Sequence, residues 1–299
     1  MTIEDRTDTY GLIGLGNVGA DLVAAAVEAG LVVHCYDVDP DARERAGSAG
    51  ATVQASARDV AAVADVFVLS LPNSQIVDQV LFDEGAIEVL RRGAYLVDMS
   101  TNHPARSQAL AAEGNARGVH VLDIPVSYGP EGLVGFAGGT TEALAAVRPW
   151  VDAVTVHTEH VGPHGHGQYV KLVQNVLSGV GMGVIGEVIG FAEHAGVDLE
   201  VLPEALRRTG ANSRMLERTL PAMVQRRYGT SGTMALHSKD MGYALTAAES
   251  IGARMPFTAA LRRVFEDVLA AGDSRWTQTA LVEWYRPSAA ETSAANDAE

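Results

Sequence analysis

A lysine and an asparagine one helical turn apart are the residues of this chain best suited to chemistry. Lys171 and Asn175 lie at the start of a long stretch of helical periodicity. Side chains at positions i and i+4 of a helix project from the same face. An amine and a carboxamide placed in this way can hold a substrate hydroxyl and move its proton. A lone lysine is more often a solvated surface residue, so the prediction depends on the elements around it.

A glycine-rich turn near the N-terminus predicts a dinucleotide site. It has the form G-x-G-x-x-G, follows a predicted strand and opens a predicted helix, which is the required context. The first glycine permits the tight turn, the second lets a pyrophosphate approach the backbone, and the third lets helix and strand pack closely. The phosphates would bind the free N–H groups at the helix start. The turn consists of Gly14, Leu15, Gly16, Asn17, Val18 and Gly19.

An acid at the end of the next predicted strand favours NAD. Asp37 directly follows the strand predicted over residues 31–36, where a carboxylate can accept hydrogen bonds from both ribose hydroxyls. Asp39 comes shortly afterwards, and no arginine directly follows Asp37. Because two acids would repel a 2′-phosphate, NAD is predicted in preference to NADP.

Two further loops follow predicted strands and are expected near the cofactor. Ligands of open α/β sheets bind outside the carboxyl ends of the strands. We therefore expect cofactor contacts from Leu71, Pro72 and Asn73 in one loop and from Thr101 in the other. Asparagine and threonine are also ordinary turn and helix-cap residues, and this alternative stays open for Asn73 and Thr101.

The apolar spacing predicts two different domains. Over residues 9–166, short apolar runs alternate with helical patterns, which predicts a Rossmann-type, doubly wound parallel sheet. Residues 167–286 predict an all-helical substrate and dimerisation domain, entered through one long helix over residues 170–195. Glycines interrupt that helix at about 1 kcal/mol each, so it needs close packing, for example from a second subunit. The composition of residues 287–299 predicts a disordered tail.

The composition is that of an acidic globular protein. Of the 299 residues, 47% are hydrophobic and 20% charged, and the net charge of −15 argues against nucleic acid as a partner. The single cysteine, Cys35, forms no internal disulfide, and no metal-ligand spacing accompanies it. There is no apolar signal segment, and no apolar run approaches the roughly 20 residues of a membrane span. We therefore expect a cytoplasmic protein without metal, nucleic-acid or membrane partners.

A Ser-x-Gly sequence after another predicted strand could bind a substrate carboxylate. A hydroxyl and free N–H groups in such a turn form an anion-binding nest. The residues assigned to this role are Ser127, Tyr128 and Gly129.

Four motifs, in order along the chain, resemble those of the β-hydroxyacid dehydrogenase family, which includes 3-hydroxyisobutyrate dehydrogenase and 6-phosphogluconate dehydrogenase. They are residues 11–19, residues 123–127, residues 165–175 and the pair Lys239-Asp240. Together they cover almost the whole chain. The resemblance implies hydride transfer between a nicotinamide cofactor and a small 3-hydroxy acid or its semialdehyde.

The resemblance also implies roles for particular residues. Lys171 would be the general acid/base, and Asn175 would bind the substrate. The Ser-x-Gly turn would hold the substrate carboxylate, and Thr101 would lie near the nicotinamide. Lys239 would close over cofactor and substrate from the helical domain. The protein is expected to form a homodimer or homotetramer.

Two departures from the family pattern leave alternatives open. Tyr128 stands where the family usually has glycine, so the substrate side chain is not implied, and Gln174 stands where many members have a first asparagine. An imine reductase-like enzyme on the same fold is one alternative, although such enzymes generally lack the lysine. A non-catalytic NAD-binding homologue is the other. Decarboxylation after oxidation, the physiological direction and the subunit number also stay open.

Overall fold

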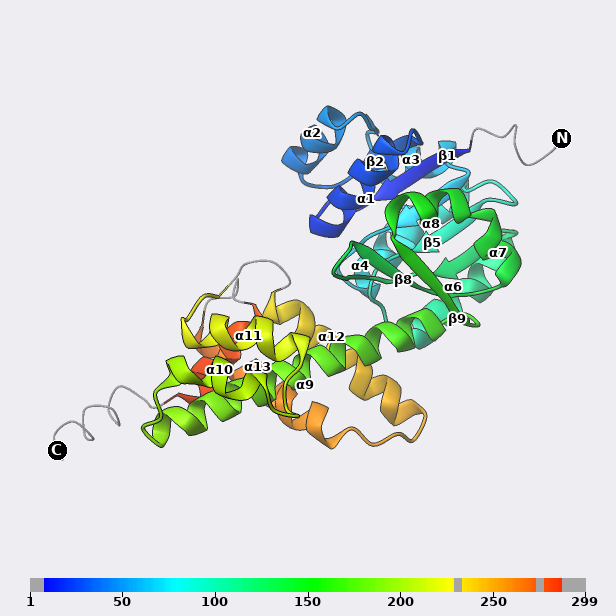
Figure 1. Ribbon diagram of the computed structural model, residues 1–299. Coiled ribbons are helices and arrows are strands. Elements are labelled where there is room, and N and C mark those ends of the chain that lie inside the picture. Colours follow the sequence, from blue (N-terminus) through cyan, green and yellow to red (C-terminus); the bar gives the residue numbers. More distant parts are fainter. Residues whose placement is uncertain (1–7, 229–232, 273–276, 287–299) are drawn as a thin grey trace. The chain divides into compact units, whose positions relative to one another are not determined.

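The computed structural model describes residues 8–228, 233–272 and 277–286 (Figure 1). The chain divides into two compact units, Met1–Leu172 and Val173–Glu299, and the division falls inside a long helix. The tail predicted at residues 287–299 lies outside the described residues.

The first unit is built on a nine-stranded sheet with the order β3-β2-β1-β4-β5-β6-β8-β7, in which β9 pairs with β8. The strands from β1 to β6 are all parallel to one another, as the alternating pattern predicts, although the short strand β3 was not predicted. They are β1 (Thr9–Ile13), β2 (Val32–Tyr36), β3 (Thr52–Val53), β4 (Val66–Leu69), β5 (Tyr95–Asp98) and β6 (His120–Asp123).

The edge beyond β6 departs from the predicted parallel sheet. It contains β7 (Val126–Tyr128), β8 (Leu133–Gly138) and β9 (His157–Gly162). Strand β8 runs antiparallel to both β6 and β7, and β9 runs parallel to β8. The sequence pattern does not predict these strands, because their pairing partners, rather than a strong apolar alternation, hold them in the sheet.

Successive strand residues point to opposite faces of the sheet, and each face is covered by its own buried cluster and helices. The sheet is therefore doubly wound. Tyr10 and Leu12 belong to one cluster, whereas Ile13 belongs to the other. The first cluster packs against α1 (Asn17–Glu28), α2 (Pro40–Ser48), α7 (Thr141–Ala146) and α8 (Arg148–Val154). The second packs against α3 (Ala57–Val63), α4 (Ser74–Asp78), the π-helical segment Gln79–Asp83, α5 (Ala86–Val89) and α6 (Pro104–Arg117).

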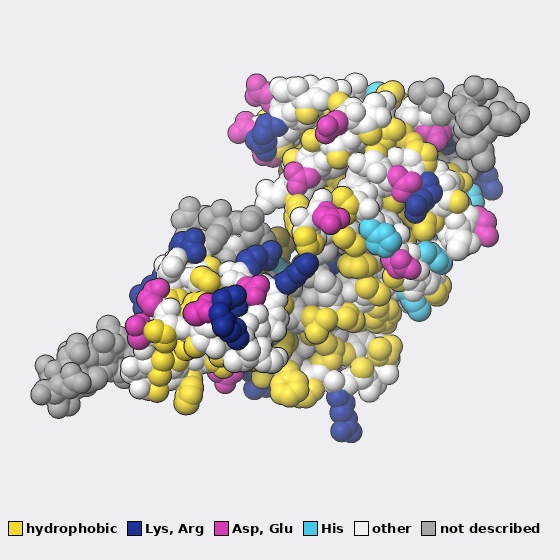
Figure 2. Space-filling model, in the orientation of Figure 1, with side chains coloured by type: hydrophobic (Ala, Val, Ile, Leu, Met, Phe, Trp, Pro, Cys, Tyr) yellow, Lys and Arg dark blue, Asp and Glu magenta, His cyan; other side chains and the backbone are white. Residues whose placement is uncertain are grey.

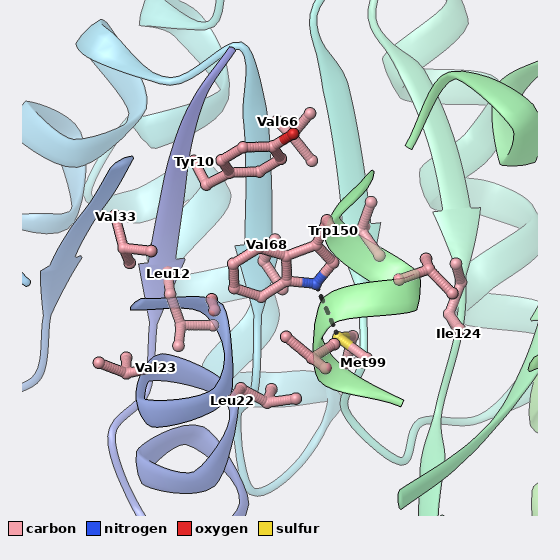
Figure 3. Close-up of a cluster of buried hydrophobic side chains, with 14 of the residues drawn as sticks. Tyr10, Leu12, Leu22, Val23, Val33, Val66, Val68, Met99, Ile124 and Trp150 are labelled. Carbon is pink, nitrogen blue, oxygen red and sulfur yellow. Dashed lines mark hydrogen bonds between the residues drawn. The ribbon is translucent and has the colours of Figure 1, made fainter. Parts of the chain in front are cut away.

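Trp150 on α8 is the largest fully buried side chain of the first cluster (Figure 3). Its ring stacks on that of Tyr10, with 5.5 Å between centroids. Its indole N–H donates to Met99 Sδ at 3.4 Å, so the polar atom of this large side chain is satisfied. These contacts fix α8 against β1 and against the end of β5.

Among the described residues of the second unit, the regular elements are helices, and one isolated bridge joins Thr233 and Thr277. Helix α9 (His166–His194) runs from the first unit into the second. The other helices are α10 (Leu202–Arg207), α11 (Arg214–Val224), α12 (Met234–Ser250), α13 (Pro256–Ala271) and α14 (Val282–Tyr285), with short 3-10 segments at Leu199–Val201 and Gln278–Leu281.

The glycines of α9 mark the places where other helices of its own unit pack closely against it. A Cβ added at Gly179 would collide with Met241 of α12, and one added at Gly183 would collide with Leu261 of α13. At Gly190 it would meet the backbone of Tyr285 at the end of α14. The close packing that the glycines require is therefore supplied within the chain itself.

Another face of α9 carries an apolar stripe, defined as Val173, Leu177, Val184, Val188 and Phe191, whose members are 43–76% exposed. By length and composition alone α9 could cross a membrane, so the prediction that no segment is apolar enough is wrong by that criterion. Core helices of soluble proteins meet the same criterion. Figure 2 shows apolar side chains at the surface of the helical unit among acidic and basic ones.

Candidate active site

The parallel strands bring the predicted cofactor segments to one edge of the sheet. Ile13 of β1 pairs with Tyr36 of β2 and with Leu69 of β4, and Leu69 in turn pairs with Asp98 of β5. The carboxyl ends of these four strands therefore lie side by side. The segments that follow are the glycine turn, Asp37, residues 71–73 and Thr101.

In the glycine turn, two glycines have no room for a side chain, whereas the third has free space around it. Gly14 has φ +93°, and a Cβ there would collide with the carbonyl oxygen of Ser70. A Cβ on Gly19 would collide with the carbonyl of Gly14, so this glycine lets α1 approach β1. A Cβ on Gly16, by contrast, would meet nothing within 4 Å. Gly16 thus borders free space, as close approach of a pyrophosphate requires.

The N-terminus of α1 is suited to bind an anion. Gly16 is the N-cap and supplies no side-chain hydrogen bond, and the first turn contains no acidic residue. Gly16 and Asn17 are both exposed. The first N–H groups of a helix lack partners within the helix and carry the positive end of its dipole. These residues therefore fit the pyrophosphate of a dinucleotide.

Asp37 is fixed by backbone donors. Its Oδ2 accepts from Leu15 N–H at 2.6 Å and its Oδ1 accepts from Asp39 N–H at 2.9 Å. Each carboxylate oxygen can accept a further hydrogen bond, so the side chain remains able to receive ribose hydroxyls. The first bond also ties the end of β2 to the glycine turn.

An arginine lies beside Asp37, which the sequence pattern does not reveal. Arg43 Nη1 donates to the carbonyl oxygens of Asp37 and Val38, at 2.6 and 3.2 Å, and its guanidinium lies 5.5 Å from the Tyr36 ring centre. Helix α2, capped by Asp39, turns Arg43 back toward the end of β2. No arginine directly follows Asp37, as the sequence shows, but the fold places the cation of Arg43 at the same strand end, so the preference for NAD over NADP stays a prediction.

The loops after β4 and β5 are tied to each other. Leu71 N–H donates to Ser100 Oγ at 2.9 Å. Asn73 Oδ1 accepts from Ile76 N–H at 2.9 Å and so caps α4, which is the structural alternative considered for it. Pro72 is exposed and Thr101 is half-buried. Cofactor contacts from these loops stay a prediction.

Strands β5 and β6 each end in an aspartate whose carboxylate is buried. Asp98 and Asp123 pair in register on the two strands, and both side chains are buried. Asp98 accepts from Ser100 N–H at 3.0 Å and from the Asn102 side-chain amide at 2.5 Å. Burial raises the pKa of Asp98 to about 6; these hydrogen bonds oppose the rise, and the charge of Asp123 adds to it.

Asp123 caps the N-terminus of α9 from another part of the chain. Its Oδ1 accepts from Gly165 N–H at 2.8 Å and its Oδ2 accepts from Gln168 N–H at 3.1 Å. Burial raises the pKa of Asp123 to about 6, against the lowering effect of these N–H groups. A Cβ on Gly167 would lie 2.8 Å from Asp123 Oδ2, so this glycine permits the approach. Within the motif that resembles a substrate site, the Asp123 carboxylate is thus directed at α9.

Gln168, in the first turn of α9, reaches across to the loop after β5. Its Oε1 accepts from Asn102 N–H at 2.8 Å, and its Nε2 donates to the Ser100 carbonyl at 2.9 Å. Its side chain is completely buried. Gln168 lies inside the motif at residues 165–175, but the sequence does not reveal these contacts, since both of its partners are backbone groups more than 60 positions away.

The predicted anion nest at residues 127–129 is wrong in one essential respect. Ser127 and Tyr128 lie in strand β7 rather than in a turn, and Gly129 N–H already donates to the Gly132 carbonyl at 2.7 Å. The Gly129 amide therefore closes the β7–β8 hairpin and is not free for a carboxylate. The Ser127 hydroxyl is half-buried, and its substrate role stays a prediction.

Tyr128 connects β7 to α1. Its side chain is 60% exposed, and its hydroxyl donates to Asp21 Oδ2 at 2.6 Å. Partial burial and the acceptor Asp21 raise the pKa of Tyr128 to about 12. The departure from the family glycine thus adds a neutral hydroxyl that is bound to α1.

Lys171 and Asn175 lie one turn apart on α9, and both are buried, at 8% and 4% exposure. Lys171 belongs to the first unit and Asn175 to the second. The helix that carries both is continuous, so the two side chains share a face. Burial excludes the alternative that Lys171 is a solvated surface lysine.

Within the second unit, Asn175 is held by Asp240. The Asn175 Nδ2 group donates to Asp240 Oδ2 at 2.8 Å. Lys239 Nζ lies 3.1 Å from Asp240 Oδ1 and 5.2 Å from the Tyr243 ring centre. The Lys239-Asp240 pair thus contacts the asparagine through its aspartate, and the predicted role of Lys239 at the cofactor stays a prediction.

The fold and the glycine turn define an NAD(P)-binding oxidoreductase with a helical second domain. Residues 9–162 match the family model described as the NAD binding domain of 6-phosphogluconate dehydrogenase. Residues 165–285 match the one described as NAD-binding of NADP-dependent 3-hydroxyisobutyrate dehydrogenase. The chain belongs to the β-hydroxyacid dehydrogenase family, as its motifs indicate.

Individual relatives agree with this assignment over nearly their whole length. The chain is 31% identical to 2-hydroxy-3-oxopropionate reductase of Escherichia coli, covering 91% of this chain and 95% of that protein. It is 32% identical to NAD-dependent L-serine dehydrogenase of Pseudomonas aeruginosa, over 82% and 86%. A solved structure of Mycobacterium tuberculosis 3-hydroxyisobutyrate dehydrogenase with L-serine superposes with a TM-score of 0.85 at 26% identity, covering 94% of this chain and 99% of that one.

Proposed function

We propose that the protein is an NAD-dependent 3-hydroxyacid dehydrogenase, or semialdehyde reductase, in which Lys171 is the general acid/base. The observation that carries this proposal is the burial of Lys171 on the helical face that also carries Asn175. Lysine is rarely buried without a specific reason. A buried amine beside a hydrogen-bonded carboxamide is suited to receive a proton from a substrate hydroxyl.

The use of lysine in the chain supports the same role. Lys171 and Lys239 are the two lysines of the sequence, and its other cationic side chains among 22 lysines and arginines are arginines. Arginine stays protonated in proteins and cannot exchange a proton near neutral pH, whereas lysine can. The chain therefore has lysine only at two positions of the family motifs.

The reaction divides between the cofactor and Lys171. The nicotinamide, when bound, supplies the hydride acceptor for oxidation or the hydride donor for reduction. In oxidation, the Lys171 amine takes the proton of the substrate hydroxyl as its carbon loses hydride and a carbonyl forms. In reduction, the protonated amine returns that proton to the carbonyl oxygen.

Asn175 orients the substrate in this proposal. Donation from its Nδ2 to Asp240 fixes which way the carboxamide faces. The carbonyl oxygen of Asn175 can then accept a hydrogen bond from the substrate hydroxyl one turn from Lys171. Asp240 acts through Asn175 and need not touch the substrate.

The proposed substrate is a small acid with an oxygen function at its third carbon. The relatives named above act on 2-hydroxy-3-oxopropionate and L-serine, and each of these compounds carries a carboxylate and such an oxygen. The Ser127 hydroxyl is the proposed carboxylate ligand, without the Gly129 amide. A panel of 3-hydroxy acids and semialdehydes, assayed with NAD and NADP, would identify the substrate.

The exposed apolar stripe of α9 supports the expected homodimer or homotetramer, because large apolar faces of soluble proteins are commonly buried between subunits. Light scattering coupled to size-exclusion chromatography measures the subunit number directly.

Replacement of Lys171 tests the proposed mechanism. We expect Lys171→Ala to lower kcat by at least roughly 100-fold, the scale of acid–base catalysis, with cofactor affinity nearly unchanged. Steady-state kinetics and cofactor fluorescence titration measure the two effects. Because the chain has two lysines, reductive ¹³C-methylation gives two lysine NMR signals besides that of the N-terminus. Lys239→Arg identifies which signal belongs to Lys171, so its titration can be followed directly.

Assays of the wild-type protein on the substrate panel and on cyclic imines, together with those of Lys171→Ala, separate the alternatives. An imine reductase would reduce cyclic imines and leave hydroxy acids unchanged. A non-catalytic homologue would bind the cofactor without turnover of any compound in the panel. Wild-type turnover of a hydroxy acid by Lys171→Ala would refute the acid/base assignment.

A further inference from the structure

A completely buried glutamine joins the first turn of α9 to the loop that carries Thr101. The Gln168 side chain accepts from Asn102 N–H and donates to the Ser100 carbonyl, so it binds the backbone on both sides of Thr101. One amide therefore satisfies two buried backbone groups of a single loop. Its own N–H is bound by Asp123 on β6.

The loop is also held from its other side. Asp98 accepts from Ser100 N–H and from the Asn102 side chain, and Ser100 Oγ accepts from Leu71 N–H. Thr101 thus lies between two residues whose backbones are fixed by Gln168 and whose side chains are bound to β5 and to the loop after β4. The backbone of residues 100–102 can therefore move little while Gln168 keeps its two hydrogen bonds.

We propose that Gln168 is a positioning residue, which sets the loop of residues 100–102 against the turn of α9 that precedes Lys171, with Asp123 anchoring that turn to β6. The inference rests on the proposed role of Lys171. Gln168 lies three positions before Lys171 on the same helix, so a shift or rotation of the first turn moves the amine as well. The interaction thereby links the Lys171 amine to the loop predicted to lie near the nicotinamide.

The chemistry of the contact requires an amide at this position. An apolar side chain of similar volume would fill the space but leave the Asn102 N–H and the Ser100 carbonyl buried without partners. A shorter amide would be polar but could not span both groups. Positioning to within a fraction of an ångström matters for catalysis, since a displacement of about 1 Å can lower a rate by roughly 100-fold.

The test compares Gln168→Met with Gln168→Asn. The first keeps volume without hydrogen bonds, and the second keeps the amide without its reach. We expect both to lower kcat by roughly 10- to 100-fold, while KM and the cofactor dissociation constant change by less than about threefold. Gln278→Met is the control for loss of a buried amide, because Gln278 is a buried glutamine of the second unit whose Nε2 has no hydrogen-bond partner among the described residues. It should leave kcat unchanged and reveal the general effect on melting temperature of losing a buried amide.

A double-mutant cycle separates positioning from general stabilisation. If Gln168 acts through Lys171, Gln168→Met should lower kcat little further once Lys171 is alanine, because the effects of coupled residues are not additive. Equal effects in the two backgrounds would overturn the proposal. Loss of folding or of cofactor binding in both Gln168 variants would also overturn it, because the side chain would then serve stability rather than the reaction.

The outcomes also distinguish failure of this inference from failure of the proposed function. If Lys171→Ala retains full turnover, the acid/base assignment fails whatever the Gln168 variants do. If Lys171→Ala is inactive while both Gln168 variants turn over like the wild type, the acid/base assignment survives and the positioning role is refuted.

Discussion

The N-termini of α1 and α9 make opposite use of the same physical feature. Both helices start at the carboxyl edge of the first unit's sheet, and each presents N–H groups without partners in the helix. At α1, Gly16 leaves these groups without a side-chain cap and exposed. At α9, the buried Asp123 carboxylate from β6 occupies them. An open N-terminus is available to a ligand, whereas a closed one fixes the helix.

The difference divides the work of the proposed active site. The open N-terminus must remain accessible, so Gly16 keeps a side chain away from the place where phosphates would bind. The closed N-terminus must remain rigid, because the helix that it anchors carries Lys171. Binding and positioning are thereby assigned to two helix starts on one sheet, and they should respond differently to substitution.

Removal of the Asp123 carboxylate should have the largest effect on stability. Asp123→Ala leaves the buried N–H groups of Gly165 and Gln168 without acceptors, and we expect the free energy of unfolding to fall by roughly 3 kcal/mol. Asp198→Ala is the control, since Asp198 caps an exposed 3-10 segment and its loss should cost about 1 kcal/mol or less. Urea unfolding of both variants measures the difference. Equal losses would contradict the special role of the buried cap.

The closed end should also make stability depend on pH. Burial raises the pKa values of Asp98 and Asp123 to about 6 in the folded protein, above the usual value of a carboxyl in the unfolded chain. The folded state therefore binds more protons between roughly pH 4 and pH 6. Their contribution to the free energy of unfolding is largest below that window and is lost as pH rises through 6, by at most about 3 kcal/mol per group.

Asp98→Asn isolates this pH effect from the titration of other groups. Urea unfolding at pH 5 and pH 7.5 should show a smaller decrease in stability with rising pH for the variant than for the wild type. The difference should amount to about 1 kcal/mol, because only part of the titration falls in this range. Identical pH dependence in the two proteins would show that Asp98 does not titrate as expected.

At the open end, a methyl group should weaken cofactor binding without affecting the fold. Gly16 has φ −64° and free space around its Cβ position, so Gly16→Ala is expected to fold normally. The added methyl would meet the incoming pyrophosphate, and we expect the cofactor dissociation constant to rise roughly 30-fold, or about 2 kcal/mol.

Gly30→Ala is the matched control for that substitution. Gly30 also has free space around it, but its φ of +81° strains any side chain. This variant should lose about 1 kcal/mol of stability and bind the cofactor normally. Calorimetry and fluorescence titration would contradict the comparison if both variants behaved alike.

The smallest expected effect concerns the adenosine end of the open site. Asp37→Ala should weaken the binding of NAD roughly tenfold more than that of NADP. Only NAD has a free 2′-hydroxyl, which can donate a hydrogen bond to the carboxylate. Arg43→Ala should weaken NADP by about threefold and leave NAD unchanged, since a partly exposed cation interacts only modestly with a phosphate. Dissociation constants for both cofactors measure the two shifts. An equal effect of Asp37→Ala on NAD and NADP would refute its ribose role.

The sequence by itself determined the features that depend on local patterns. The glycine turn, the parallel strands β1, β2, β4, β5 and β6, the long helix and the shared face of Lys171 and Asn175 all follow from spacing over a few residues. Such patterns are readable because strand and helix periods are fixed by backbone geometry. The same local reading fails at residues 126–162, where the strands of the sheet edge are held by their partners.

Only the tertiary structure decided how α9, the helix that carries Lys171, is held. The cap of α9 comes from Asp123, which is 42 positions from Gly165, and Gln168 binds the backbone of a loop more than 60 positions away. A hydrogen bond depends on distance and angle in space, not on separation along the chain. For the same reason the sequence could not show that the Gly129 amide is used in a hairpin, or that Arg43 returns to Asp37. Local periodicity identified the lysine, but the network that fixes it exists only once the sheet has brought β5, β6 and α9 together.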